Sequence, residues 1–213
     1  MCEEEKTMLK ERLPVAVLVS GGGTNLEALL RAEESGLITS AHIALVVADR
    51  KGCHAIERAQ ARGVATLTLP RRRLGPQAFE EALEEAVTAA GCRLIVLAGF
   101  LSILSPDFVS RHRDRIVNVH PSLIPAFCGD GFYGLRVHQA ALERGVKVTG
   151  ATVHLVNEIT DGGRILAQKA VEVHEGDSPE TLQRRVMEEA EWVLLPQVVE
   201  DLAQNISKKE IGE

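Results

Sequence analysis

Residues 14–34, PVAVLVSGGGTNLEALLRAEE, contain the pattern that decides the fold. The segment 14–20 is almost entirely apolar, which is typical of a strand buried on both faces of a sheet. Three glycines follow, and residues 24–34 then have apolar side chains at helical spacing, with Thr24 as the expected N-cap. A buried strand, a glycine turn and a helix in this order predict the start of a parallel strand–helix–strand unit.

The same alternation of short apolar runs and amphipathic segments continues outward from this stretch. It predicts right-handed crossovers and a mainly parallel sheet, whereas two late strands joined by a turn at 161–163 predict an antiparallel edge. The expected fold class is therefore α/β: a single domain with a mostly parallel mixed sheet and helices on both faces. Its expected strands are 14–20, 42–48, 65–69, 94–98, 116–120, 147–157 and 165–174, and its expected helices are 24–34, 55–62, 77–90, 135–144 and 182–203.

Composition and charge argue against several classes of protein. Acidic residues outnumber basic ones, 30 to 24, and the formal net charge of -6 argues against a nucleic-acid partner. The one basic run, 71–73, is expected to be a solvated loop, with attraction of an anionic substrate as the alternative.

The charged ends, 1–12 and 206–213, are expected to fray. Cysteines occur without a C-x-x-C pair, which argues against a zinc site and a disulfide framework: Cys2, Cys53, Cys92 and Cys128.

The start of the chain and its hydropathy predict a cytoplasmic protein. The first twelve residues are charged and lack the apolar stretch of a signal peptide. No apolar run approaches the ~18–20 residues that a membrane span requires, so no membrane partner is expected.

The glycine turn at 20–25, SGGGTN, has the context of a phosphate-binding loop. Glycines let the backbone approach an anion, and the N-terminus of the following helix offers free N–H groups and a partial positive charge. The dinucleotide fingerprint would need glycine where Leu26 stands, and the G-K-[ST] of a P-loop is missing. A tight turn without a ligand remains the alternative.

A second candidate site lies at the end of the strand predicted at 116–120. Asn118 and His120 are two residues apart, so their side chains point to the same side, at the edge where open parallel sheets bind ligands. An amide donor beside an imidazole suits acyl transfer, because one holds a developing oxyanion and the other moves a proton. The alternative is a strand-end pair that only serves loop hydrogen bonds.

Asp161, in the turn at 160–163, is a third candidate because its charge would stabilise a protonated His120 if the two lie close together. An Asp-Gly turn with no other role is the alternative. The remaining histidines are expected to be structural, and no metal site is predicted: His42, His54, His112 and His174 stand alone, and His138 and His154 have no paired ligand spacing.

These segments resemble the folate-dependent phosphoribosylglycinamide formyltransferases from Val15 to Leu202, almost the whole chain. Each motif alone could be accidental, but their ordered set is specific. In order, the motifs are SGGGTNL (20–26), LAGFLSILSPDFV (97–109), NVHPSLIP (118–125), VTGATVHLV (148–156), DGGRIL (161–166) and AEWVLLP (190–196).

The resemblance implies a formyltransferase domain at 14–205, with a nucleotide phosphate-binding N-terminal half and a folate-binding C-terminal half. It implies transfer of the formyl group of 10-formyltetrahydrofolate to the amine of N1-(5-phospho-D-ribosyl)glycinamide, giving the N-formyl product and tetrahydrofolate in de novo purine biosynthesis. It also implies small-molecule substrates, no metal, and a monomer or homodimer.

By position, the resemblance assigns a role to each motif. Asn118 would bind the formyl oxygen, His120 would be the acid/base residue, and Asp161 would tune His120. The ribose phosphate would be held by Gly23, Thr24 and Asn25, and the nucleotide would also contact Glu191. The folate site would consist of Leu101, Ser102, Ile103 and Leu104 around the pterin, with Asn118, Asn157, Glu158, Ile159, Thr160 and Asp161.

The chain departs from the family pattern at four places. Trp192 stands where the family often carries a His, and one extra residue lies between Arg185 and Glu191. The segment 127–137 is longer than in many relatives. An Arg that some relatives direct at the folate falls near Pro76, which leaves Arg73 as a candidate replacement.

Three other functions compete with this interpretation. A hydrolase that releases formate from the same folate resembles the chain in its catalytic residues but usually has an N-terminal regulatory domain. A methionyl-tRNA formyltransferase usually has a C-terminal RNA-binding domain, and we expect 213 residues to leave no room for either addition. A non-catalytic nucleotide-binding module would explain the glycines, but it would not explain Asn118, His120 and Asp161 together.

Overall fold

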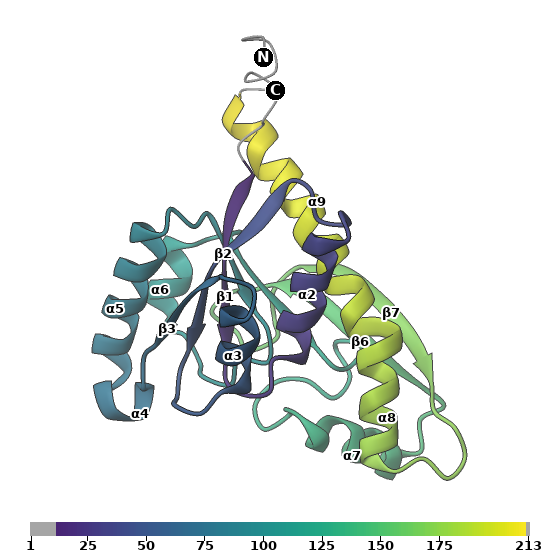
Figure 1. Ribbon diagram of the computed structural model, residues 1–213. Helices are drawn as coiled ribbons and strands as arrows, with labels where there is room; N and C mark the ends of the chain where they lie inside the picture. Colours follow the sequence, from purple (N-terminus) through teal and green to yellow (C-terminus); the bar gives the residue numbers. More distant parts are fainter. Residues whose placement is uncertain (1–11, 212–213) are drawn as a thin grey trace.

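The protein is described here by a computed structural model over residues 12–211. Its seven strands form one sheet in the order β3-β2-β1-β4-β5-β6-β7. Strands β1 to β5 pair in parallel, β6 pairs antiparallel with β5, and β7 pairs antiparallel with β6 (Figure 1). The strands are β1 (Leu13–Val19), β2 (Ala41–Ala48), β3 (Ala65–Thr68), β4 (Leu94–Leu97), β5 (Ile116–His120), β6 (Val148–Leu155) and β7 (Ile165–Glu172). This confirms the predicted mixed sheet with an antiparallel edge.

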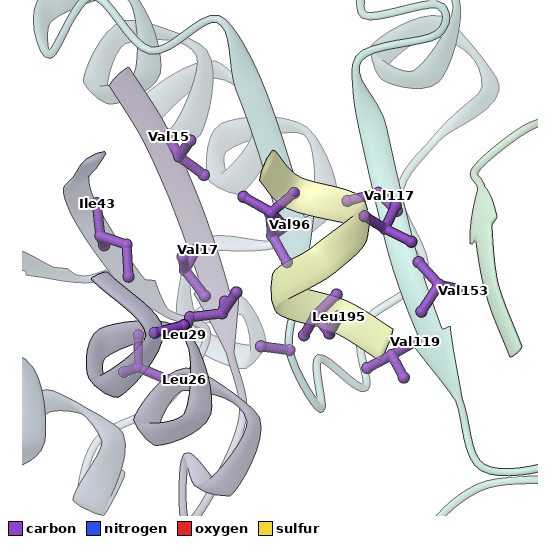
Figure 2. Packing of buried hydrophobic residues seen from close by; sticks show 14 of the residues in the cluster. Val15, Val17, Leu26, Leu29, Ile43, Val96, Val117, Val119, Val153 and Leu195 are labelled. Atoms are coloured by element: carbon purple, nitrogen blue, oxygen red, sulfur yellow. The ribbon is translucent and has the colours of Figure 1, made fainter. Parts of the chain in front are cut away.

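Helices cover both faces of the sheet and create two hydrophobic cores. Alternate residues of β1 face opposite cores: Val15 and Val17 pack with α2 and α9, whereas Ala16 and Leu18 pack with α5 and α6. Figure 2 shows Leu195 of α9 among the valines of the central strands. The helices of the first face are α2 (Thr24–Glu34), α3 (His54–Gln60) and α9 (Trp192–Ile211), and those of the second are α5 (Pro76–Ala89) and α6 (Pro106–Arg111).

The last helical region differs most from the sequence prediction. A single helix at 182–203 was expected, but the structure has α8 (Pro179–Val186), a π-helical turn η1 (Met187–Glu191) and α9 (Trp192–Ile211) in succession. The frayed end predicted at 206–213 is wrong up to Ile211, because these residues continue α9 and Ile206 is buried. The frayed start predicted at 1–12 and Cys2 lie outside the described residues, apart from residue 12.

Two short helices were not predicted, and one predicted cap is wrong. The basic run expected as a loop forms α4 (Arg71–Leu74), and α6 begins after Ser105, whose side chain accepts a hydrogen bond from the Phe108 N–H. The N-cap of α2 is Gly23 rather than Thr24. The helix α7 (Leu135–Arg144) has its predicted bounds.

The strand order places a crevice at the carboxyl edge of the sheet, between the loops that follow β1 and β4. From β1 the chain proceeds to β2 and β3 on one side, and it then crosses to β4 on the other side of β1. The loops that leave β1 and β4 therefore lead to α2 and α6 on opposite faces of the sheet. A crevice at such a reversal of strand order is the usual ligand site of open α/β sheets.

Candidate active site

A cleft of about 730 Å³ lies at this carboxyl edge. Its walls bring together segments that are distant in sequence: the start of α2, the loop after β4, the end of β5, the loop before α7, the β6–β7 turn and the η1 turn. The predicted site residues that line it are Thr24, Asn25, Leu101, Ser102, Ile103, Leu104, Asn118, His120, Asn157, Glu158, Ile159, Thr160, Asp161 and Glu191.

Two hydrogen bonds from α3 hold the glycine loop in place. The N–H of Ala55 donates to the Gly21 carbonyl over 3.2 Å, and Arg58 Nε donates to the Gly22 carbonyl over 2.9 Å. Gly23 has φ 75°, and a Cβ there would lie 2.6 Å from the Ala55 Cβ, so this position requires glycine. Two loop carbonyls thus face α3, next to an α2 N-terminus that has no side-chain cap.

Asn25 and Glu191 form a buried pair that joins α2 to the η1 turn. Asn25 Nδ2 donates to Glu191 Oε2 over 2.6 Å, and both residues line the cleft. Burial raises the pKa of Glu191 to about 7, and the hydrogen bond from Asn25 opposes this rise only in part. The π turn ends at Glu191, and such a turn accommodates one extra residue in a helix. The extra residue noted in the sequence is therefore absorbed without turning Glu191 away from the cleft.

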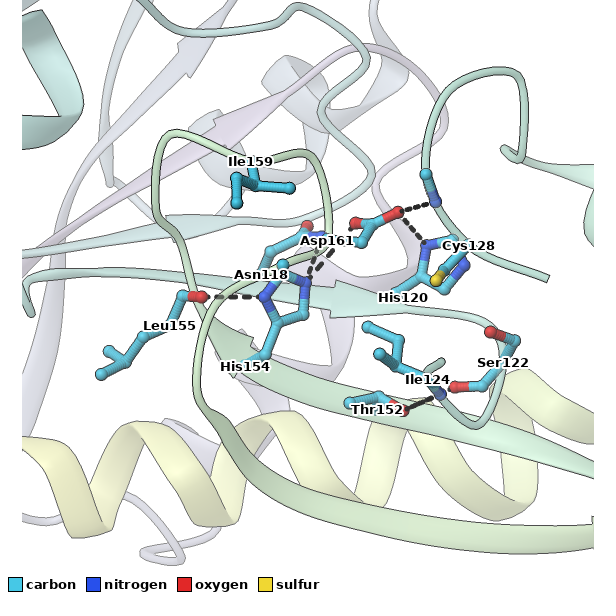
Figure 3. Close-up of polar contacts among 12 residues, drawn as sticks. Asn118, His120, Ser122, Ile124, Cys128, Thr152, His154, Leu155, Ile159 and Asp161 are labelled. Carbon is cyan, nitrogen blue, oxygen red and sulfur yellow. Dashed lines mark hydrogen bonds and ion pairs between the residues drawn. The ribbon is translucent and has the colours of Figure 1, made fainter. Parts of the chain in front are cut away.

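Asn118, His120 and Asp161 converge on one side of the cleft, as Figure 3 shows. Asp161 Oδ2 lies 3.5 Å from His120 Nδ1, so the condition under which Asp161 would act on His120 is met. His120 Nε2 lies 2.9 Å from the Phe127 carbonyl and donates its proton there, because a carbonyl only accepts. Nδ1 is therefore the ring nitrogen that faces the carboxylate.

Asp161 is fixed by several contacts at once. It adopts φ 54° in the turn between β6 and β7, and its Oδ2 accepts a hydrogen bond from the Gly129 N–H over 2.9 Å. Burial acts to raise the pKa of Asp161, but its contact with His154, the charge of His120 and the Gly129 N–H together hold that pKa below its ordinary value. Asp161 is thus a carboxylate at neutral pH.

His154 belongs to this cluster, although the sequence indicated only a structural histidine. Its Nε2 lies 3.6 Å from Asp161 Oδ1 and 3.1 Å from Asn118 Nδ2, and its Nδ1 lies 2.8 Å from the Leu155 carbonyl. The carbonyl requires a proton on Nδ1, so in the neutral ring Nε2 accepts from the Asn118 amide. The second amide hydrogen of Asn118 remains for another partner.

Three exposed apolar side chains, Leu101, Ile103 and Ile159, form an apolar wall of the same cleft. Leu101, Ile103 and Ile159 line the cleft with at least half of their surface exposed, at 51%, 67% and 68%. Such exposure of large apolar side chains marks a binding surface. The arginines that line the cleft are Arg50 and Arg72, so Arg73, the expected replacement for the family Arg, lies outside the lining.

The fold and this arrangement match known proteins. The family model described as formyl transferase matches residues 13–199. The chain belongs to the formyl transferase family. It is 38% identical to the phosphoribosylglycinamide formyltransferase of Bacillus subtilis, an alignment that covers 88% of this chain and 93% of the relative. The crystal structure of glycinamide ribonucleotide transformylase 1 from Symbiobacterium toebii superimposes with a TM-score of 0.84 at 39% identity and covers 91% of this chain and 89% of that one.

Other relatives are longer than this chain. The chloroplastic phosphoribosylglycinamide formyltransferase of Arabidopsis thaliana is 38% identical over 84% of this chain, which spans 61% of that relative. Within residues 12–211, no helix has the length and apolar character to cross a membrane. Among the same residues, no group of three or more His, Cys, Asp or Glu side chains is arranged to hold a metal ion.

Proposed function

We propose that this formyl transferase family member moves the formyl group of 10-formyltetrahydrofolate to the amine of N1-(5-phospho-D-ribosyl)glycinamide, in purine biosynthesis. The observation that carries the proposal is the convergence of Asn118, His120 and Asp161 between the glycine loop and an apolar wall. The names of the Bacillus and Symbiobacterium relatives support the same reaction.

The two ends of the cleft suit two different substrates. The N-terminus of α2, with its unpaired backbone N–H groups beside Gly23, suits the ribose phosphate. The pair formed by Asn25 and Glu191 offers polar groups for the remainder of the nucleotide. The wall formed by Leu101, Ile103 and Ile159 suits the flat pterin of the folate.

The reaction centre supplies the groups that formyl transfer needs. The substrate amine attacks the formyl carbon, and a tetrahedral intermediate with an oxyanion forms. The free amide hydrogen of Asn118 and a protonated His120 Nδ1 stabilise that oxygen. The bond between the formyl carbon and the folate nitrogen then breaks, and the proton lost by the amine passes to the departing nitrogen with the help of His120. No step requires a metal.

Asp161 acts through His120 in this mechanism. The Phe127 carbonyl accepts a hydrogen bond from His120 Nε2, and the Asp161 carboxylate lies 3.5 Å from Nδ1. The ring is therefore held with Nδ1 free to take up the proton that the substrate amine loses. The Gly129 N–H donates to the carboxylate and keeps it in place.

The main competing function is hydrolysis of the same folate, which would use the same residues with water as the nucleophile. We expect purified protein to form tetrahydrofolate from 10-formyltetrahydrofolate only when the ribonucleotide is present, as followed by absorbance. The dephosphorylated riboside should serve poorly, because it cannot use the α2 N-terminus. Equal rates with and without the amine would indicate a hydrolase, and binding of the nucleotide without turnover would indicate a non-catalytic module.

A further inference from the structure

A buried carboxylate lies outside the reaction centre, at the same edge of the sheet. Asp49 directly follows β2 and has only 4% of its surface exposed. Its N–H donates to the Val19 carbonyl over 3.2 Å, so it sits beside the end of β1, where the glycine loop begins. The mechanism above gives this residue no role, and a buried carboxylate persists only when several donors compensate it.

The groups that stabilise the Asp49 carboxylate come from three segments. Arg50 Nε and Nη2 donate to its two oxygens over 2.8 and 3.1 Å, and Ser102 Oγ donates to Oδ2 over 2.6 Å. Ser20 Oγ accepts the Leu101 N–H over 2.8 Å, and Ser20 is among the groups that lower the pKa of this carboxylate. Burial acts to raise the pKa of Asp49, but these donors hold it below its ordinary value, so the group is ionised.

Together with the bond from the Asp49 N–H to the Val19 carbonyl, the bonds from Leu101 to Ser20 and from Ser102 to Asp49 form a closed circuit across the crevice at the carboxyl edge. Ser20 is the residue before the glycine loop, and Leu101 and Ser102 begin the apolar wall after β4. The two loops lead to opposite faces of the sheet, and the circuit through Asp49 joins them where they diverge. A second connection runs parallel to it: the Arg71 N–H donates to the Asp49 carbonyl, and Arg71 Nη2 donates to the Ile103 carbonyl over 3.0 Å.

We propose that Asp49 is a positioning residue that sets the separation between the glycine loop and the part of the apolar wall that follows β4, Leu101 and Ile103. This inference rests on the proposed function, in which one loop anchors the nucleotide and the other the folate. Transfer requires the amine nitrogen and the formyl carbon to be held about 3–3.5 Å apart in the right orientation. A displacement of about 1 Å costs on the order of 100-fold in rate. A residue that fixes the distance between the two anchors fixes that approach.

Only a carboxylate satisfies this arrangement of donors. Both oxygens of Asp49 accept from the Arg50 guanidinium and Oδ2 also accepts from the Ser102 hydroxyl, whereas the amide of asparagine has a single acceptor atom. Asp49→Asn therefore keeps the size of the side chain and breaks at least one arm of the circuit. Ser102→Ala removes only the arm to the apolar wall.

The chain offers a matched control in Asp177. It also forms a two-bond ion pair, with Arg185 at 2.6 and 2.7 Å, and its side chain is 5% exposed, but it lies before α8 and does not line the cleft. We expect Asp49→Asn to raise KM for both substrates and to lower kcat/KM by about tenfold or more. Ser102→Ala should raise KM for the folate alone. Asp177→Asn should lower the melting temperature and leave both KM values unchanged.

Amide hydrogen exchange tests the circuit without any assumption about activity. The Leu101 N–H is protected by its bond to Ser20 Oγ, and Asp49→Asn should speed its exchange by about tenfold, whereas Asp177→Asn should not. Unchanged Leu101 exchange in Asp49→Asn, or faster exchange with both KM values unchanged, would overturn the proposal. If the wild-type protein transfers no formyl group, the proposed function fails, and the exchange rates alone then decide whether Asp49 joins the two loops.

Discussion

Asp161 is the residue on which the reaction centre depends most. Its carboxylate contacts His120, His154 and the Gly129 N–H, and these contacts hold its pKa below the ordinary value although burial opposes them. A depressed carboxyl pKa contributes stability that is present above the unfolded pKa of about 3.9 and is lost as pH falls through the folded pKa. The same contacts that position Asp161 therefore make the folded protein sensitive to acid.

Asp161→Asn should cut turnover by roughly 100-fold or more, because the amide keeps the size but removes the negative charge beside His120 Nδ1. His120→Asn should be equally severe. The two residues act as one unit, so the double variant should lose much less than the product of the single losses. Steady-state kinetics of the four proteins measure this coupling, and fully multiplicative losses would show that the two residues act separately.

Glu191 should make the stability of the folded protein depend on pH in the opposite direction from Asp161. Its pKa is raised to about 7, so the stability that its neutral form contributes is fully present below pH ~4.3 and is lost as pH rises through about 7. The shift from 4.5 corresponds to roughly 3 kcal/mol. Glu191→Gln should match wild type at pH 5 and exceed it at pH 8.5 by up to this amount in urea unfolding, while it binds the nucleotide more weakly. If Glu191→Gln and wild type are equally stable at both pH values, the ionised Glu191 carboxylate is stabilised by neighbouring groups as well as its neutral form is.

The sequence predicted three residues of the reaction centre but not the fourth. Asn118 and His120 were predictable because they share one strand, and Asp161 because it stands in an Asp-Gly turn. His154 was not, because its place depends on the antiparallel register that sets Asn118 opposite His154 in β6. Register follows from packing and turn geometry rather than from any local motif.

At the scale of elements, the glycine loop depends on its contact with α3. Gly23→Ala should cost about 1–3 kcal/mol and weaken nucleotide binding, because φ is 75° and the new methyl would meet Ala55. Gly21→Ala is the matched control, since no atom lies within 4 Å of the added carbon. Thermal unfolding and KM for the nucleotide should separate the two variants. Similar behaviour of both would show that the loop is not held by α3.

The π turn between α8 and α9 predicts a tolerated deletion. Removing the exposed Glu189 should convert η1 to regular helix, leave Glu191 in the cleft, and change stability by less than about 1 kcal/mol. Removing the exposed Asp201 from α9 should rotate the following residues by about 100° and expose Ala203 and Ile206, at a cost of about 2 kcal/mol or more. Urea unfolding and nucleotide KM measure both, and equal destabilisation would mean that the π turn does not accommodate an extra residue.

The elements that the sequence missed are short or depend on tertiary contacts. Helix α6 has only six residues, although Ser105 and Pro106 are ordinary start signals for a helix. Helix α4 has four residues and is supported by Arg71, which bonds to the Ile103 carbonyl and lies over the Phe79 ring. The long strands and helices were predictable because their apolar periodicity is strong. The end of α9 was not, because charged residues carry little periodicity.

At the scale of the whole molecule, the reversal of strand order explains why one cleft serves two substrates. The loop after β1 supplies the glycines, the loop after β4 supplies the apolar wall, and the β5 end and the β6–β7 turn supply the reaction centre between them. Alternating strands and helices predict that these loops share one edge, but not how far apart they lie. That distance is a property of the packed fold.

In the proposed reaction this cleft transfers a formyl group to the amine, and His120 participates in the step. The most direct measurement supplies 10-formyltetrahydrofolate labelled in its formyl carbon, together with the ribonucleotide, and locates the label by mass spectrometry. We expect wild type to place the label on the nucleotide amine, and His120→Asn to do so at least about 100-fold more slowly. Label found mainly in formate, or an unchanged rate in His120→Asn, would contradict the account.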